Sequence, residues 1–223
     1  MINISKRLQT IAELVLDGNS RKIIDVGCDH ALLDIYLLQN NQNLKIVASD
    51  NKKAPLESAR KNIERYSFLN KIELSLRDGI ESIDDDIDTI VIAGMGMDTI
   101  VEILEKNKNE LKNIERLIIS SNNKYAELRE KICALGFYIK EERIIFDDGK
   151  FYIAIEFIKG IKNYSKKELY FGPILLTKKE KIFNNYYKEI LTEKKLILNS
   201  LPNSHQKRES LEKEIELLSN EVK

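Results

Sequence analysis

The chain contains 223 residues, of which 43% are hydrophobic and 32% are charged. This composition excludes disordered and collagen-like proteins, and the length is typical of one domain with or without a small addition. The 36 basic and 36 acidic side chains cancel, but residues 161–208 carry 11 basic and 4 acidic ones. This local net charge of +7 indicates a polyanion contact confined to one part of the chain.

The two cysteines, Cys28 and Cys133, are far apart and belong to no CxxC or Cys/His cluster. This spacing argues against a disulfide scaffold and a structural zinc site, so we expect no metal. No apolar run approaches the ~18 residues of a membrane span. The N-terminal apolar residues have amphipathic-helix spacing and not that of a signal peptide. We therefore expect a cytoplasmic protein that does not contact membranes.

The chain begins with an amphipathic helix over residues 4–17, and short β-branched runs then alternate with helical stretches. Strands that alternate with helices predict an α/β fold with a doubly wound, largely parallel sheet. Strands are expected at 22–27, 44–50, 71–76, 87–93 and 115–121, and helices at 31–40, 53–66, 97–110 and 124–135.

The alternation ends at residues 136–160, which are expected to form two strands joined by a tight turn at Asp148-Gly149. Residues 161–173 are interpreted as a linker. Residues 177–200 and 204–222 are expected to form two charged helices, separated at Leu201-Pro202-Asn203. The simplest arrangement of these two helices is an antiparallel helical hairpin.

The first candidate site follows the first strand, where Asp25 precedes Gly27, Cys28 and Asp29. A glycine there lets the backbone approach a ligand closely. The loop lacks the GxGxxG pattern of a pyrophosphate site, and its two carboxylates suit a ligand that carries an ammonium and a sulfonium group. An ordinary strand–turn–helix remains the alternative. Cys28 has no evident base partner and is interpreted as a small loop residue.

Two further acids follow the next two strands. Asp50, with Asn51 beside it, is placed to accept hydrogen bonds from ribose hydroxyls, although such a residue is often only a loop solvator. The carboxylate of Asp78, before Gly79, could accept from an adenine amino group, and the alternative is a turn signal. Three consecutive strand ends carrying acids favour the functional interpretation.

Small residues follow the fourth strand in the run 93–97, which begins with Ala93, Gly94 and Met95. They leave room above the sheet where a transferable methyl group and its acceptor would meet. The alternative is tight packing of a helix on a strand. The Pro-Pro-aromatic motif of many enzymes that methylate nucleic-acid amino groups is missing here.

Four polar residues are expected near the acceptor: Asp29, His30, Asn122 and Tyr152. A histidine at a helix start is more often a structural hydrogen-bonding residue than a catalytic one. Asn122 could orient the edge of a base, and helix capping ahead of Lys124 is the equal alternative.

Several motifs, taken in order, resemble the TrmK family of bacterial tRNA (adenine-22-N1)-methyltransferases over nearly the whole chain. These motifs are ISKRL, DVGCDHALL, SDNKKAPLESARKNI, RDGI, IAGMGMDTI, GKFYIAIEF and FGPILL. The chain departs from the family pattern at Asp34, where proline is usual, at Met97, where glycine is usual, and at Ser120-Ser121, where Gln-Pro is usual. The last departure falls where the substrate base is expected.

The resemblance implies a class I S-adenosylmethionine-dependent methyltransferase domain over residues 1–160 and a helical coiled-coil domain over 161–223. A doubly wound sheet that ends in an antiparallel hairpin agrees with this class. The cofactor would be S-adenosylmethionine, the partner would be tRNA, and we expect a monomer. Donor binding is assigned to Asp25, Gly27, Cys28, Asp50, Asn51, Asp78, Gly79, Ala93, Gly94 and Met95.

The same resemblance implies methylation of adenine N1, whose lone pair needs no base to remove a proton. Because the product is cationic, a nearby carboxylate would stabilise it, and Asp29 is the first choice, with His30 and Asn122 beside it. Contacts to tRNA are assigned to Arg7, Tyr152, Lys166, Lys167, Lys178, Lys179, Lys181 and Lys188. For each single lysine, a solvated surface remains the alternative.

Two other functions stay open at this point. A methyltransferase acting on a small molecule or a protein would share the fold, but it would predict a lid over the pocket, and the sequence shows none. A non-catalytic RNA-binding relative is favoured only by Ser120-Ser121. It is disfavoured by the intact acids Asp25, Asp50 and Asp78.

Overall fold

The computed structural model describes residues 1–202 and 204–222. The chain folds into two compact units, Met1–Ile174 and Leu175–Lys223, and each is described by itself. Two sequence predictions, the helix break at Leu201-Pro202-Asn203 and the end of the tail domain at Lys223, include Asn203 and Lys223, which lie outside the described residues.

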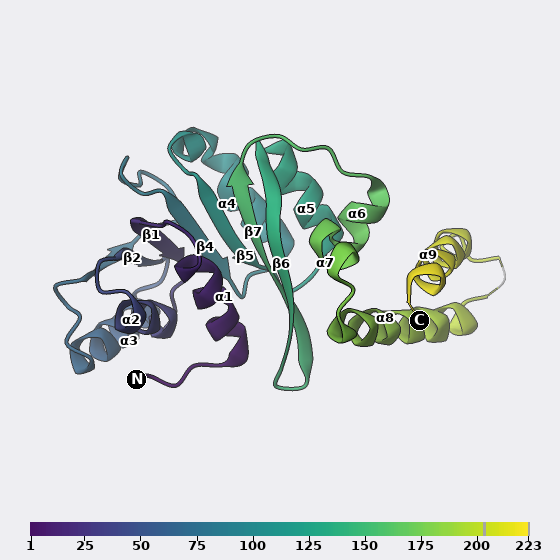
Figure 1. Ribbon diagram of the computed structural model, residues 1–223, viewed down its shortest axis with the longest axis horizontal. Coiled ribbons are helices and arrows are strands. Elements are labelled where there is room, and N and C mark those ends of the chain that lie inside the picture. Colours follow the sequence, from purple (N-terminus) through teal and green to yellow (C-terminus); the bar gives the residue numbers. More distant parts are fainter. Residues whose placement is uncertain (203, 223) are drawn as a thin grey trace. The chain divides into compact units, whose positions relative to one another are not determined.

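The first unit contains the predicted alternation of strands and helices (Figure 1). Its strands are β1 Lys22–Val26, β2 Lys45–Asp50, β3 Ile72–Leu76, β4 Thr89–Ala93, β5 Arg116–Ser120, β6 Phe137–Asp147 and β7 Lys150–Lys159. Its helices are α1 Lys6–Leu16, α2 Leu32–Asn40, α3 Lys53–Arg65, α4 Met97–Lys106, the 3₁₀ turn η1 Lys108–Lys112, α5 Tyr125–Ala134 and α6 Lys166–Phe171.

The seven strands form one mixed sheet in the order β3-β2-β1-β4-β5-β7-β6. β1 to β5 pair in parallel, whereas β7 runs antiparallel to both β5 and β6. This arrangement confirms the predicted doubly wound sheet and its closing hairpin. The strand order reverses between β1 and β4, and ligands of such sheets bind above the carboxyl ends of the strands at this reversal.

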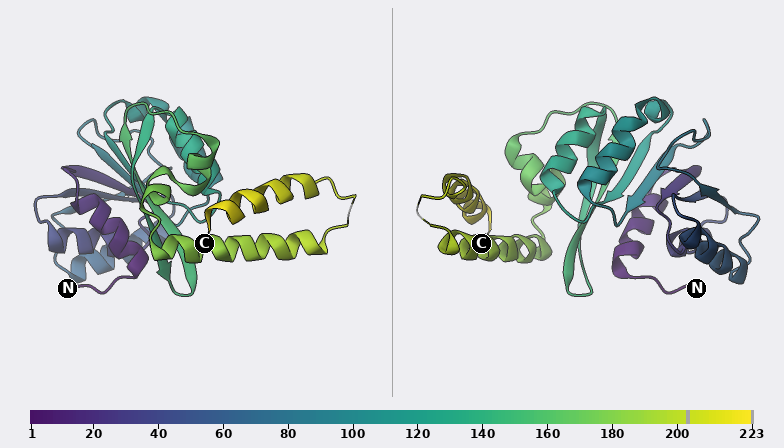
Figure 2. Two further views of the ribbon diagram at one scale, coloured as in Figure 1. Left: turned by 45° about the vertical axis from the view of Figure 1, so that its right-hand side comes forward. Right: turned by 180° about the vertical axis from the view of Figure 1, so that it is seen from behind.

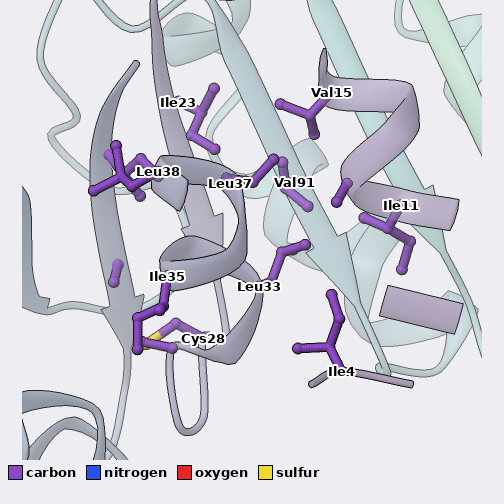
Figure 3. Close-up of a cluster of buried hydrophobic side chains, with 14 of the residues drawn as sticks. Ile4, Ile11, Val15, Ile23, Cys28, Leu33, Ile35, Leu37, Leu38 and Val91 are labelled. Carbon is purple, nitrogen blue, oxygen red and sulfur yellow. The ribbon is translucent and has the colours of Figure 1, made fainter. Parts of the chain in front are cut away.

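Helices cover both faces of the sheet, with α1, α2 and α3 on one face and α4 and α5 on the other (Figures 1 and 2). Figure 3 shows the core of the first face, where Ile11 and Val15 of α1 and Leu37 of α2 pack near Ile23 of β1 and Val91 of β4. All five are at most 1% exposed. Burying such side chains stabilises the fold by about 1.5–3 kcal/mol each, and here it fixes the loop between β1 and α2.

The first unit continues past the predicted domain boundary at residue 160. The Tyr164 hydroxyl donates to the Ile139 carbonyl and accepts from its N–H, and Phe171 is fully buried. Arg129 and Glu142 form a buried ion pair, with Nε 2.6 Å from Oε1. Arg129 also donates to the carbonyl of Leu169, at the end of α6. The segment expected to be a linker therefore belongs to the first unit, and the boundary lies at 174.

The second unit consists of helices, of which α7 Pro173–Lys178 spans the boundary. The two long helices are α8 Lys181–Ser200 and α9 Arg208–Glu221, and they pack on each other. Their contact includes an ion pair between Lys194 and Glu214. Within the described parts of the chain, no helix combines the length and the apolar character that crossing a membrane requires.

Candidate functional site

In the loop after β1, the backbone of Gly27 and Cys28 borders an open space that a side chain at position 27 would fill. The N–H groups of Gly27 and Cys28 both donate to the Ser49 carbonyl of β2, at 2.8 and 3.0 Å. Gly27 has φ +78°, and a Cβ there would lie 2.4 Å from the terminal methyl of Met95. A side chain at position 27 would therefore be strained and would close the space between the loops after β1 and β4.

This space is a cavity of about 460 Å³ above the carboxyl ends of β1, β2 and β4. Its polar side chains come from the ends of β1 and β2, from the loops that follow these strands, and from α1. The lining residues include Arg7, Asp25, Gly27, Cys28, Asp29, His30, Asp50, Asn51, Ala93, Gly94 and Met95. The structure thus brings together eleven of the residues singled out from the sequence.

A second cavity of about 170 Å³ adjoins the first and shares Gly27, Asp50, Asn51 and Met95 with it. Asp78 and Gly79 line only this second cavity. Each of the ten residues assigned to the donor from the sequence therefore lines at least one of two adjoining cavities. We refer to these two cavities together as the acidic cleft.

Two acids at or near the first cavity are buried, and burial raises the pKa of each. Asp25 is 3% exposed, and burial together with the nearby Asp50 carboxylate raises the pKa of Asp25 to about 7. Asp34, on α2, is fully buried, and neither of its carboxylate oxygens has a hydrogen-bond partner among the described residues. Burial and the adjacent Asp25 raise the pKa of Asp34 well above its ordinary value. Burial also raises the pKa of the Cys28 thiol, which agrees with its interpretation as an unreactive loop residue.

The acids after β2 and β3 also make local hydrogen bonds. Asp50 accepts at 2.9 Å from the N–H of Lys52, which stabilises the turn into α3. Asp78 accepts at 3.0 Å from the ammonium group of Lys106 on α4. Gly79 has φ +62°, and a Cβ there would meet Ile103, so the turn itself requires glycine. Both carboxylates therefore have a local role besides their place at the cavities.

The loop after β5 lies against the loop after β4. The Asn122 side chain donates at 2.7 Å to the Gly94 carbonyl, and its backbone N–H donates at 2.9 Å to the Met95 carbonyl. The capping alternative for Asn122 is not observed, because Lys124 precedes α5 without a side-chain cap. The adjacent Asn123 is the residue that accepts from a helix start, through the N–H of Met97.

Arg7, on α1, lines the first cavity close to Gly94 in the loop after β4. Its guanidinium stacks over the Tyr152 ring at 5.0 Å, and its backbone N–H donates to Asp147. Gly94 is close enough that a Cβ there would lie 3.6 Å from the Arg7 guanidinium. Tyr152 thus supports Arg7 but does not itself line either cavity. The β6–β7 hairpin in this way positions a cation beside a cavity of acids.

Asp29 and His30 are exposed at the edge of the first cavity. The carboxylate of Asp29 is 71% exposed and lies 3.5 Å from Nε2 of His30. Asp29 has φ +50° and Ala31 φ +55°, so the backbone between Cys28 and α2 is tightly turned. The carbonyl of His30 accepts from Asn62 of α3, and this bond holds the turn in place.

The lysines assigned to tRNA lie on the C-terminal helices. Lys166 and Lys167 belong to α6 and line neither cavity. Lys178 ends α7, Lys179 follows it, and Lys181 and Lys188 lie on α8. Lys179 is paired with Glu221 at 2.8 Å.

Sequence reasoning missed the contribution of α4. Thr99, Ile103 and Lys106 line the second cavity. They recur at spacings of four and three residues after the AGMGM run, which places them on one helical face. This periodicity was the available signal.

The fold and the site define the class of the protein, because a reversed parallel sheet with an antiparallel last strand and an acidic cleft at the reversal is the architecture of class I methyltransferases. Comparison with known sequences then identifies the family. The model of the TrmK family, tRNA (adenine(22)-N(1))-methyltransferase, matches residues 23–220. The chain belongs to this family.

Individual relatives agree with this assignment. The chain is 31% identical over 189 residues to the tRNA (adenine(22)-N(1))-methyltransferase of Bacillus subtilis (strain 168), covering 82% of this chain and 79% of that protein. The structure of M. capricolum TrmK with S-adenosyl-homocysteine matches with a TM-score of 0.86 and 30% identity, covering 97% and 96% of the two chains. The structure of Streptococcus pneumoniae Sp1610 in complex with S-adenosyl-L-methionine matches with a TM-score of 0.90 and 31% identity. The match covers 99% of this chain and 100% of that chain.

Proposed function

We propose that this protein transfers a methyl group from S-adenosylmethionine to N1 of adenine 22 in tRNA. The observation that carries the proposal is the acidic cleft at the strand reversal, in a chain that belongs to the TrmK family. The curated Bacillus subtilis relative has this activity by name.

The residues of the cleft fit the donor. Bound S-adenosylmethionine supplies a methyl group on a positively charged sulfur, next to an ammonium group. The buried carboxyl of Asp25 favours a cationic ligand, because a nearby positive charge stabilises its ionised form. Asp50 is the ribose ligand in this proposal, and the open backbone at Gly27 provides the close approach that a side chain would block. Two relatives were solved with this donor or its product bound.

The acceptor chemistry needs alignment and charge stabilisation more than a base. Neutral adenine N1 carries an in-plane lone pair, so no proton has to leave before attack. The chain must hold N1 in line with the methyl group and exclude water. As the ring becomes cationic, the exposed carboxylate of Asp29 at the cavity edge stabilises the developing charge. In this proposal His30, whose Nε2 lies 3.5 Å from the Asp29 carboxylate, does not act as a base.

The tRNA-contacting surface is assigned to one face of α8, which we name the lysine stripe. The stripe consists of six exposed residues, which are Lys181, Asn185, Lys188, Thr192, Lys195 and Asn199. Their alternating spacing of four and three residues places them on one helical face. Successive lysines, seven residues apart, are separated by about 10.5 Å along the axis.

The stripe contains no carboxylate, and within the described chain its three lysines form no ion pair. Such a row of free ammonium groups and neutral donors suits the phosphate backbone of a folded RNA. In this proposal α8 and α9 form an antiparallel coiled coil that presents the stripe. Because one chain carries both the donor cleft and the stripe, we also propose that the protein acts as a monomer, in the cytoplasm.

The proposal is tested by transfer of labelled methyl from S-adenosylmethionine to unmodified tRNA, followed by nucleoside analysis. We expect 1-methyladenosine at position 22, and a tRNA with guanosine at position 22 serves as the control. Donor binding without methylated tRNA would contradict the proposed substrate. It would direct attention to Ser120 and Ser121, which replace the Gln-Pro of the family.

The role of Asp29 is tested by Asp29→Asn, which keeps the shape and removes the charge. Calorimetric affinity for S-adenosyl-homocysteine should stay within a few-fold of the wild type, whereas kcat should fall on the order of a hundredfold. The matched control is Glu57→Gln, which changes an exposed carboxylate that lines neither cavity and should leave kcat unchanged. An unchanged kcat in Asp29→Asn would remove Asp29 from the mechanism.

A further inference from the structure

The amide of Asn122 is locked in one orientation. Its partner at 2.7 Å is the Gly94 carbonyl, which can only accept a hydrogen bond. The side-chain nitrogen must therefore face Gly94, and the side-chain oxygen must point the other way. The backbone N–H of Asn122 is bonded to the Met95 carbonyl, so the residue is held at two points.

The side-chain oxygen of Asn122, which points away from Gly94, accepts no hydrogen bond from the described residues, and Asn122 is exposed. Both partners of Asn122, Gly94 and Met95, line the first cavity. The adjacent Asn123 differs, because its side-chain oxygen is used internally by the N–H of Met97 at 3.1 Å. Of these two neighbouring asparagines, only Asn122 therefore presents a free, fixed acceptor next to the cavity.

We propose that the side-chain oxygen of Asn122 accepts a hydrogen bond from the N6 amino group of the target adenine and so selects adenine at the methylation site. This inference rests on the proposed function. On adenine, the N6 donor lies beside the N1 lone pair, so a base held through N6 presents N1 to the methyl group. On guanine, an acceptor oxygen replaces the amino group and N1 carries a proton, so the Asn122 oxygen would repel it.

The same hydrogen bond strengthens during the reaction. The methyl carbon leaves sulfur and bonds to N1 through the N1 lone pair, the sulfur keeps the electron pair of the broken bond and becomes neutral, and the purine becomes cationic. No proton moves in this step. The positive charge spreads to N6 and makes its N–H a better donor, so the bond to Asn122 is stronger in the transition state than in the ground state. Loss of the bond should therefore lower kcat as well as kcat/KM.

The test combines a change in the enzyme with a change in the base. Wild type and Asn122→Ala are assayed on two tRNAs that carry adenine or unsubstituted purine at position 22, since purine keeps N1 but lacks the amino group. The ratio of the two kcat/KM values should fall about tenfold in Asn122→Ala relative to wild type, the value of one hydrogen bond to a base. Intrinsic reactivity of the two bases cancels in this comparison.

Asn123→Ala is the matched control, because it should lower the melting temperature through loss of its bond to α4 but leave the adenine-to-purine ratio unchanged. Calorimetric binding of S-adenosyl-homocysteine checks the fold of each variant. If Asn122→Ala does not bind it, Asn122→Ser is assayed in its place. An unchanged ratio in the Asn122 variant overturns the inference, as does wild-type enzyme that methylates both tRNAs equally well. If wild type forms no 1-methyladenosine at position 22, the proposed function fails first and the inference fails with it.

Discussion

The two units of the molecule differ in where they place their charges. Met1–Ile174 contains ion pairs in which both side chains are buried, as in Arg129–Glu142 and Arg116–Glu156. In Leu175–Lys223, each described ion pair has at least one exposed side chain, and in Lys213–Glu209 the two side chains are 72% and 80% exposed. Exposed pairs of this kind contribute at most about 1 kcal/mol each.

The difference separates two requirements of the proposed reaction. A methyl group must meet one atom in line, and this requires the close-packed unit in which Asn122, Gly94 and Met95 hold each other. A folded RNA must be held by its phosphates, and this requires free cations more than an exact fit. Changes in the first unit should therefore alter stability or chemistry, and changes on the lysine stripe should alter RNA affinity.

The largest expected effect is loss of stability when the buried pair is broken. Glu142 accepts from Arg129 and from the N–H of Ile174, so Glu142→Gln removes a charge that two donors use. Leaving Arg129 buried without its partner should lower the free energy of unfolding by about 3–5 kcal/mol. Chemical denaturation measures the change. Glu130→Gln, an exposed change next to Arg129, should stay within about 0.5 kcal/mol. A loss below ~1 kcal/mol in Glu142→Gln would contradict the contrast between the units.

The next effect concerns the lysine stripe. Replacing Lys181, Lys188 and Lys195 together by glutamine should weaken tRNA binding on the order of a hundredfold at low salt, and should reduce the slope of log Kd against log salt by about 2–3. Affinity for S-adenosyl-homocysteine should not change. The control is Lys194→Gln with Lys213→Gln, which removes lysines already paired with Glu214 and Glu209. If both sets weaken binding equally, the stripe has no special role.

A smaller effect is expected from pH. Burial raises the pKa of Asp25 to about 7 in the free protein, whereas a cationic donor favours its ionised form. Affinity for S-adenosylmethionine should therefore increase about tenfold between pH 6 and pH 8, as the ionised fraction rises. Calorimetry in the absence of tRNA measures this, and Asp25→Asn should flatten the dependence. The free energy of unfolding of the free protein should change with pH in the opposite direction. The stability that protonated Asp25 contributes is complete below pH ~4 and is lost as pH rises through about 7.

Comparison of the same two regions also explains what the sequence could predict. Strands and helices of the first unit follow from the alternation of β-branched runs with helical spacing, and the donor residues follow because parallel strand ends meet at one edge. Asp25, Asp50 and Asp78 could therefore be brought together without a structure. The domain boundary could not, because Tyr164 and Leu169 join the first unit through hydrogen bonds to Ile139 and Arg129, which are distant in sequence.

Two features of the site depend on such distant contacts as well. The orientation of the Asn122 amide is set by the Gly94 carbonyl, 28 residues away, and no local pattern shows it. Asp34 is the one charged residue in the otherwise apolar run 31–38, and α2 turns its carboxyl into the core. The sequence marked Asp34 as a departure from the family, and only burial reveals its energetic cost.

The smallest effect is expected at Asp34, where the first unit departs from its own rule of pairing buried charges. Both carboxylate oxygens are buried without a partner among the described residues, and such a group costs about 1–3 kcal/mol. Asp34→Leu should therefore raise the free energy of unfolding, by about 1 kcal/mol after losses from imperfect packing. Because burial raises the pKa of Asp34, the cost grows with pH, so the gain should be larger at pH 8 than at pH 5. Denaturation at both pH values measures it. A variant that is less stable than wild type at pH 8 would show that Asp34 has a partner in solution, such as an internal water.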